Sequence, residues 1–113
     1  MVVGELEPAA ADRVFHALAD ATRRDIVTRV IRHEQSVSAI ARHYPMSFAA
    51  VQKHVAVLER AALVTKHKRG REQVVCANLT TLNRAARLLD AYERLWRERV
   101  DRIATILAEN EEG

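Results

Sequence analysis

The 113-residue chain contains only one cysteine, two prolines and three glycines. A single cysteine cannot form an intramolecular disulfide, which fits a reducing compartment. Because prolines and glycines are few, the sequence is expected to be poor in turns and rich in helix. No apolar run approaches the ~20 residues that a membrane-spanning helix needs, and the acidic first residues lack the basic start of a secretory signal. We therefore expect a cytoplasmic protein with no membrane partner.

The sequence also lacks the residue patterns of known catalytic and metal sites. It shows no nucleophile paired with a base, no glycine-rich phosphate loop and no metal triad, so we expect no enzyme activity, no cofactor and no metal. Cys76 could act as a redox switch, but a lone cysteine on a strand is more often a small buried hydrophobe. The five histidines could form an unusual metal site, but they are scattered over different predicted elements, and most of them are interpreted as surface or packing residues: His16, His33, His43, His54 and His67.

Positive charge is concentrated in the middle of the chain. The net charge is +3, but residues 42–71 contain seven lysines and arginines and one acidic residue, Glu59. Both flanks carry slightly more acidic than basic side chains. A basic centre between such flanks is the expected footprint of nucleic-acid binding, although a solvated basic surface would have the same composition. Charge alone therefore leaves both interpretations open.

Hydrophobic periodicity and capping residues predict four helices, a hairpin and a long last helix. The first four helices are expected over 9–19, from the N-cap Asp20 to Ile31, after the N-cap Ser38, and over 48–61 after the N-cap Ser47. Strands over 64–68 and 73–77 flank a turn at 69–72, and the last helix covers 81–107. Residues 1–113 are thus predicted to form one mainly α domain with a small β-hairpin wing, in the order α-α-α-α-β-β-α.

The helix over 48–61 has two different faces. At 3.6 residues per turn, Val51, Val55 and Leu58 share an apolar face, and Lys53 and Arg60 lie opposite. A short helix, a turn, a helix with an exposed basic face and a basic hairpin together predict a winged helix-turn-helix, whose second helix enters the major groove. Double-stranded operator DNA is therefore the predicted partner. The predicted contacts are Ser47, Phe48, Ala49, Gln52, Lys53, His54, Lys68, Arg69 and Arg71.

Three side chains near this surface have two interpretations each. His54 would either contact a phosphate or pack against the protein. Phe48 would either touch a thymine methyl group or join the core. Arg23 would either contact the DNA backbone or form an ion pair with Asp20 or with the last helix.

The last helix is too long for a compact domain of this size. At about 1.5 Å per residue it would span ~40 Å, whereas such a domain has a diameter of about 35 Å. Because its apolar stripe continues to the end, a second copy of the chain is expected to cover it in a two-fold homodimer. The alternative is a monomer in which this helix bends back over the first. The predicted dimer surface consists of Phe15, Leu89, Tyr92, Trp96, Val100, Ile103 and Leu107.

Three segments resemble the ArsR/SmtB family of repressors. Residues 17–27, ALADATRRDIV, resemble the opening signature of that family. Residues 47–58, SFAAVQKHVAVL, resemble its recognition helix, and residues 61–64, AALV, resemble its exit into the wing. The resemblance implies a dimeric winged-helix protein that binds a two-fold operator and usually represses transcription.

The sequence departs from the metal-sensing members of that family. Residues 36–43, SVSAIARH, contain no cysteine, and the last helix has carboxylates but no histidine, a poor ligand set for zinc. The resemblance therefore implies a member without the usual metal site. Two alternatives stay open. One is a metal, redox or small-molecule sensor with a different site, and the other is a protein-interaction module that no longer reads DNA. An unidentified small-molecule effector is also left open.

Overall fold

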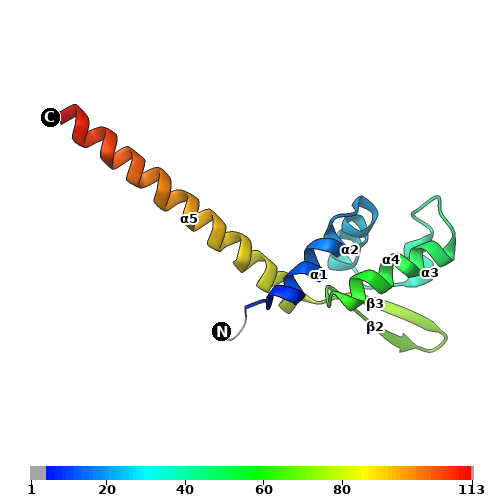
Figure 1. Ribbon diagram of the computed structural model, residues 1–113. Coiled ribbons are helices and arrows are strands. Elements are labelled where there is room, and N and C mark those ends of the chain that lie inside the picture. Colours follow the sequence, from blue (N-terminus) through cyan, green and yellow to red (C-terminus); the bar gives the residue numbers. More distant parts are fainter. Residues whose placement is uncertain (1–4, 113) are drawn as a thin grey trace.

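A computed structural model of the protein describes residues 5–112, so residues 1–4 and 113 of the predicted domain lie outside the description. Along this range the elements follow in the order α1 (Pro8–Leu18), α2 (Ala21–Arg32), β1 (Gln35–Ser36), α3 (Val37–Ala41), α4 (Phe48–Arg60), β2 (Val64–Arg69), β3 (Glu72–Ala77) and α5 (Leu79–Glu112). Figure 1 shows α1–α4 gathered beside the β2–β3 hairpin. The predicted winged helix-turn-helix is confirmed.

Three helices begin at side chains that cap their first free N–H groups. Asp20 accepts a hydrogen bond from the Arg23 amide at 3.0 Å, and Ser47 Oγ accepts one from the Ala50 amide at 3.1 Å. The prediction of Ser38 as the third cap is wrong, because Ser36 Oγ accepts from the Ala39 amide at 3.1 Å. Ser36 ends the short strand β1, and α3 begins directly after it.

The sheet has three antiparallel strands in the order β1-β3-β2. β1 adds a strand to the hairpin that the sequence predicted, with Gln35 opposite Val75. β2 and β3 pair from Val64–Ala77 to Arg69–Glu72, so the turn is shorter than the predicted 69–72. Gly70 makes this tight turn feasible because it adopts a φ of +64°, which glycine tolerates without steric cost.

The core lies between the helices and the inner face of this sheet. Ile26 of α2, Ile40 of α3, Leu58 of α4 and Val75 of β3 are all fully buried, and Val14 of α1 joins them. Burying such side chains contributes roughly 1.5–3 kcal/mol each. This packing holds α4 against α2, α3 and the hairpin and leaves its outer face free.

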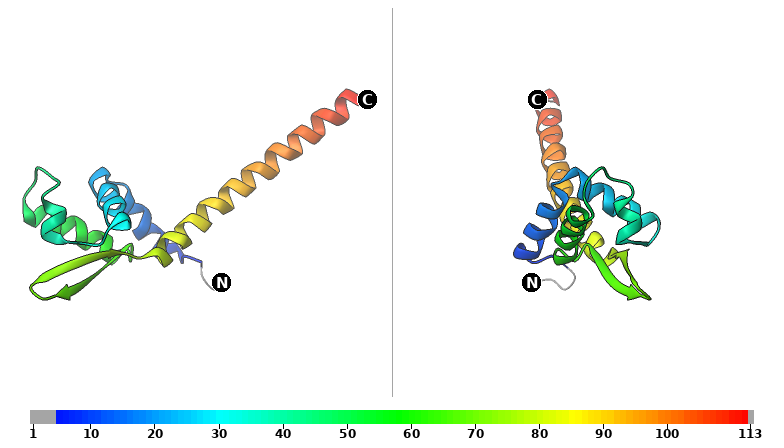
Figure 2. Two further views of the ribbon diagram at one scale, coloured as in Figure 1. Left: turned by 180° about the vertical axis from the view of Figure 1, so that it is seen from behind. Right: turned by 90° about the vertical axis from the view of Figure 1, so that its right-hand side faces the viewer.

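Helix α5 leaves the domain as a straight rod. Figure 1 and the left view of Figure 2 show it running away from the other elements, with its C-terminal end far from them. The molecule measures 74 × 33 × 22 Å, and its radius of gyration is 19.8 Å, against about 13 Å for a compact domain of this length. The alternative that this helix bends back over α1 is therefore wrong. None of the helices within the described range is both long and apolar enough to span a membrane.

Candidate nucleic-acid interface

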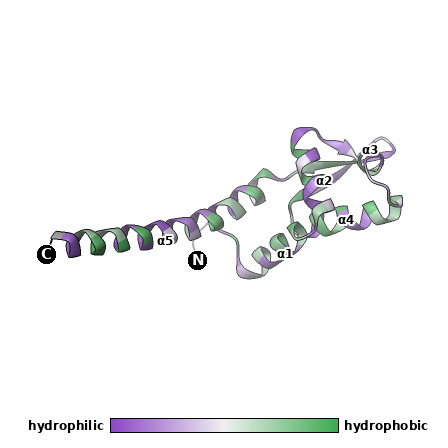
Figure 3. Cartoon of the chain, turned by 90° about the horizontal axis from the view of Figure 1, so that it is seen from above, coloured by the Kyte–Doolittle hydropathy of each residue, from purple (hydrophilic) through white to green (hydrophobic). Residues whose placement is uncertain are grey.

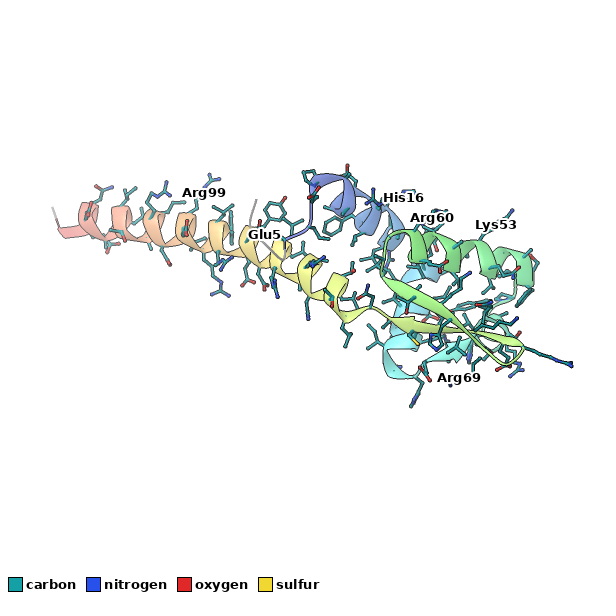
Figure 4. The ribbon with its side chains drawn as sticks, turned by 90° about the horizontal axis from the view of Figure 1, so that it is seen from below. Glu5, His16, Lys53, Arg60, Arg69 and Arg99 are labelled. Carbon is teal, nitrogen blue, oxygen red and sulfur yellow. The ribbon has the colours of Figure 1, made fainter. Side chains whose placement is uncertain are left out.

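The outer face of α4 is basic and accessible. Val51, Val55 and Leu58 are completely buried, as the helical period predicted. On the opposite side Lys53 and Arg60 are exposed, and Figure 4 shows both pointing away from the body of the protein to the same side. Ala49 and Gln52 are exposed along this face as well, and Ala56 is partly exposed. The small side chains of the two alanines would let a ligand approach the helix closely.

The first turn of α4 combines a cap with an apolar side chain. Ser47 is exposed, but its hydroxyl oxygen already accepts the Ala50 amide. Phe48 is 47% exposed, so it is not a core residue, which removes the packing interpretation and leaves its ring accessible. Both residues therefore lie at the accessible end of the helix that a winged-helix protein directs at the base edges.

A hollow of about 150 Å³ lies between α4 and the wing, beside the place where the two pack together. Phe48 and Gln52 line it from α4, Ser38 lines it from α3, and Lys66 and Arg71 line it from the hairpin. Gln52 and Arg71, which are 19 positions apart in sequence, thus face the same space. The tertiary structure places a candidate base-reading residue beside a candidate phosphate-binding residue.

The wing residues differ in how freely they can reach a ligand. Lys68, Arg69 and Arg71 are all exposed. Arg69 is held by a carboxylate, because its guanidinium donates to Glu34 Oε1 at 3.0 Å. Figure 4 shows Arg69 on the side of the molecule opposite Lys53 and Arg60. Among the ion pairs formed by residues 5–112, none involves Arg71. Arg71 is therefore the better placed of the two arginines.

His54 and Arg23 form a structural contact behind α4. Arg23 Nε donates to the Ala17 carbonyl at 2.7 Å, and a second guanidinium nitrogen donates to the His16 carbonyl at 3.1 Å, so Arg23 caps the end of α1. His54 Nδ1 lies 3.4 Å from the Arg23 guanidinium and 3.9 Å from Asp20 Oδ2. The packing interpretation of His54 is favoured over a phosphate contact, and Arg23 bonds α1 rather than α5.

The predicted dimer surface is uncovered in one chain. Figure 3 shows apolar and polar stretches alternating along α5, as a helix with one apolar face requires. The side chains proposed from the sequence are all exposed, by 38–62%: Phe15, Leu89, Tyr92, Trp96, Val100, Ile103 and Leu107. Leu95 and Ile106 are exposed beside them, and a wider apolar stripe in the helical period would have identified both.

The outer face of the sheet carries a polar cluster that sequence reasoning missed. Cys76 Sγ donates to Glu34 Oε2 at 3.1 Å and lies 3.8 Å from His67 Nδ1. The hydrogen bonds from Cys76 and Arg69 lower the pKa of Glu34, and burial together with the nearby Glu34 carboxylate raises the pKa of the Cys76 thiol. Cys76 is partly exposed rather than the small buried hydrophobe that was expected.

Comparison with known proteins identifies related transcription regulators. No protein-family model matches the chain. The chain is 39% identical over 85 residues to the HTH-type transcriptional regulator Rv2034 of Mycobacterium tuberculosis, covering 75% of this chain and 77% of that protein. It is 28% identical over 71 residues to the transcriptional repressor SdpR of Bacillus subtilis, covering 63% and 79%.

Comparison with solved structures also identifies transcription regulators. An ArsR-like transcriptional regulator from Rhodococcus sp. RHA1 superposes with a TM-score of 0.76 at 38% identity, covering 87% of this chain and 92% of that one. The homodimeric winged helix-turn-helix DNA-binding domain Mb0332 from Mycobacterium bovis superposes with a TM-score of 0.63 at 22% identity, covering 75% and 80%. The second likeness is one of fold.

Proposed function

Because the chain belongs to the ArsR family of transcription regulators, we propose that it is a cytoplasmic, sequence-specific DNA-binding repressor that binds a two-fold operator as a homodimer. The observation that carries this proposal is the shared hollow of Gln52 and Arg71, next to the basic outer face of α4. A helix in the major groove reads base edges, and a wing beside it contacts the backbone.

The two halves of this surface have different roles in the proposal. Gln52 carries an amide that can pair with both the N6 amino group and N7 of an adenine. Lys53, on the next position of the exposed face, reaches guanine or a phosphate. Arg71 supplies positive charge on the wing side, where it binds phosphate irrespective of sequence. The proposed function therefore separates base reading by α4 from backbone affinity by the wing.

The homodimer is proposed from α5. Exposed apolar patches of this length are unusual on a monomer and favour a partner surface. A two-fold axis would bury the same stripe of both copies, with Trp96 and Ile103 near its middle and Phe15 of α1 at its side. The same axis would present two recognition helices to a two-fold DNA site.

A binding measurement tests the proposal against the interaction-module alternative. We would measure the affinity by fluorescence anisotropy for two sets of labelled DNA, fragments from upstream of the protein's own gene and random fragments of equal length. Each affinity would be measured at several salt concentrations. The proposal expects tighter binding to one fragment and a log–log fall of affinity with salt, of slope about −0.9 per neutralised phosphate. Equal affinity for all fragments, or no binding at low salt, would favour an interaction module instead.

A further inference from the structure

We propose that Glu34, His67 and Cys76 form a zinc-binding site on the outer face of the wing sheet. These three side chains place a carboxylate oxygen, an imidazole nitrogen and a thiol sulfur within 4.8 Å of one another. The site uses neither α3 nor α5, and it lies on the side of the hairpin away from the hollow that Gln52 and Arg71 share.

The strand register explains why these residues meet. β1 pairs with β3 so that Gln35 is opposite Val75, which brings Glu34, one residue earlier, next to Cys76. β2 pairs with β3 so that Thr65 is opposite Cys76 and His67 is opposite Val74. Because alternate residues of a strand point to the same face, His67 and Cys76 are diagonal neighbours on one face. Three neighbouring segments of the sheet, the start of β1, β2 and β3, thus each contribute one ligand.

The observed distances fit a tetrahedral metal site. Zinc binds sulfur at about 2.3 Å and nitrogen or oxygen at about 2.0–2.1 Å, so neighbouring ligand atoms of one zinc ion are about 3.5 Å apart. Cys76 Sγ lies 3.1 Å from Glu34 Oε2 and 3.8 Å from His67 Nδ1. Small side-chain movements would therefore bring all three atoms to one ion.

The chemistry of the donors selects zinc over magnesium or calcium, which prefer sets made only of oxygen. Three protein ligands leave a fourth position for water. Arg69 bonds Oε1 of Glu34, which leaves Oε2 for the metal and orients the carboxylate, as outer partners of metal ligands do. Glu34 and His67 are exposed and Cys76 is partly exposed, so an ion can enter directly from solvent. Binding replaces the Cys76 thiol proton, which is released to the buffer.

Zinc competition with a chromophoric chelator and cobalt spectroscopy test the site directly, on the full chain without DNA. We expect one zinc per chain, bound with a dissociation constant of about 1 µM or lower, and release of about one proton per ion. Cobalt should show a near-ultraviolet thiolate charge-transfer band and the visible bands of tetrahedral coordination. Cys76→Ser should abolish the charge-transfer band, and Glu34→Gln and His67→Gln should each weaken zinc binding at least tenfold, in line with loss of one ligand.

His16→Ala is the matched control, because His16 is an exposed histidine on α1, outside the cluster. It should bind zinc like the unmodified chain, and circular dichroism should show that all four variants are folded. The inference is overturned if the unmodified chain binds no zinc in this range, or if Cys76→Ser and His67→Gln bind it as tightly as His16→Ala does.

One consequence of the site rests on the proposed function. Zinc on Oε2 would weaken the ion pair between Glu34 and Arg69, but Arg69 lies on the side of the molecule opposite Lys53 and Arg60. Zinc should therefore change the affinity for operator and random DNA by no more than about twofold, less than the contribution of one full exposed ion pair. A chain that binds zinc but not DNA would contradict the proposed function alone, and a chain that binds DNA but not zinc would contradict the metal site alone.

Discussion

At the scale of single residues, Gln52 is the side chain from which we expect sequence specificity. It is exposed on α4 and lines the hollow that opens beside the wing. Gln52→Ala should cost ~1–3 kcal/mol on the preferred operator, because an amide pair to one base is lost. Anisotropy titrations on operator and random DNA measure the difference. An equal loss on both would show that Gln52 contacts the backbone instead.

Arg71 should act on all sequences alike. It is exposed and faces the same hollow, so its replacement should remove the phosphate contact proposed for it. Arg71→Ala should weaken operator and random DNA similarly and lower the salt slope by about one. Arg69→Ala is the matched control, because Arg69 is already bonded to Glu34 and should change the slope less. A larger effect at Arg69 would place the DNA on the other side of the wing.

The carboxylate of Asp25 links α2 to the loop between α3 and α4. It accepts a hydrogen bond from the Tyr44 hydroxyl and another from Arg29 Nε at 2.8 Å. The Tyr44 bond, followed by the Arg29 bond, lowers the pKa of Asp25, and partial burial with the Asp25 bond raises the pKa of Tyr44 to about 12. The folded state therefore favours the ionised carboxylate.

A carboxyl group whose pKa is lower in the folded than in the unfolded state contributes stability above its unfolded pKa of about 4, and this contribution disappears as the pH falls through the folded value. Asp25→Asn should therefore lower the melting temperature at pH 7, and its difference from the unmodified chain should close on acidification. Melting curves from pH 7 to pH 2 measure this, with Asp12→Asn, an exposed position on α1, as the control. A difference that stayed constant with pH would argue against the ionised Asp25 bond.

At the scale of elements, the start of α3 depends on Ser36. Its hydroxyl oxygen accepts the Ala39 amide, whereas Ser38 is exposed inside the helix. Ser36→Ala should lower the free energy of unfolding by about 1 kcal/mol, the usual contribution of an N-cap. Ser38→Ala should leave it nearly unchanged, because alanine is the better helix former. Urea denaturation of the two variants compares them, and equal losses would contradict the assignment of the cap.

At the scale of the whole molecule, the proposed homodimer depends on α5. Ile103 is 48% exposed in the apolar stripe, while Thr105 lies on the opposite face of the helix. Ile103→Glu should dissociate the dimer and abolish operator binding without altering α4 or the wing, because charges would be forced into the apolar contact. Thr105→Glu should preserve both properties.

Sedimentation at micromolar concentration measures the mass of each variant. The unmodified chain should sediment at twice its 12.8 kDa, and Ile103→Glu should sediment at 12.8 kDa. A mass of 12.8 kDa for the unmodified chain would exclude the proposed homodimer.

The sequence alone determined the features that depend on regular spacing within a single helix. The helical period identified the buried face of α4, the basic face opposite it and the apolar stripe of α5, because one turn of helix brings residues three and four apart together. Capping chemistry located the starts of α2 and α4 for the same local reason. Charge counting likewise found the basic middle of the chain, since it needs no geometry.

Only the tertiary structure decided which distant residues meet. β1 exists because Gln35 and Ser36 pair with β3. The strand ends at Ser36, and this residue caps α3 in place of the predicted Ser38. The same pairing brought Glu34 to Cys76, a contact that spans 42 positions. Arg69 bonds Glu34 on the same face of the sheet, and the packing of α4 against the hairpin places Arg71 and Gln52 on one hollow. These contacts depend on strand register and helix packing, which connect positions far apart in the chain and leave no periodic signal in the sequence.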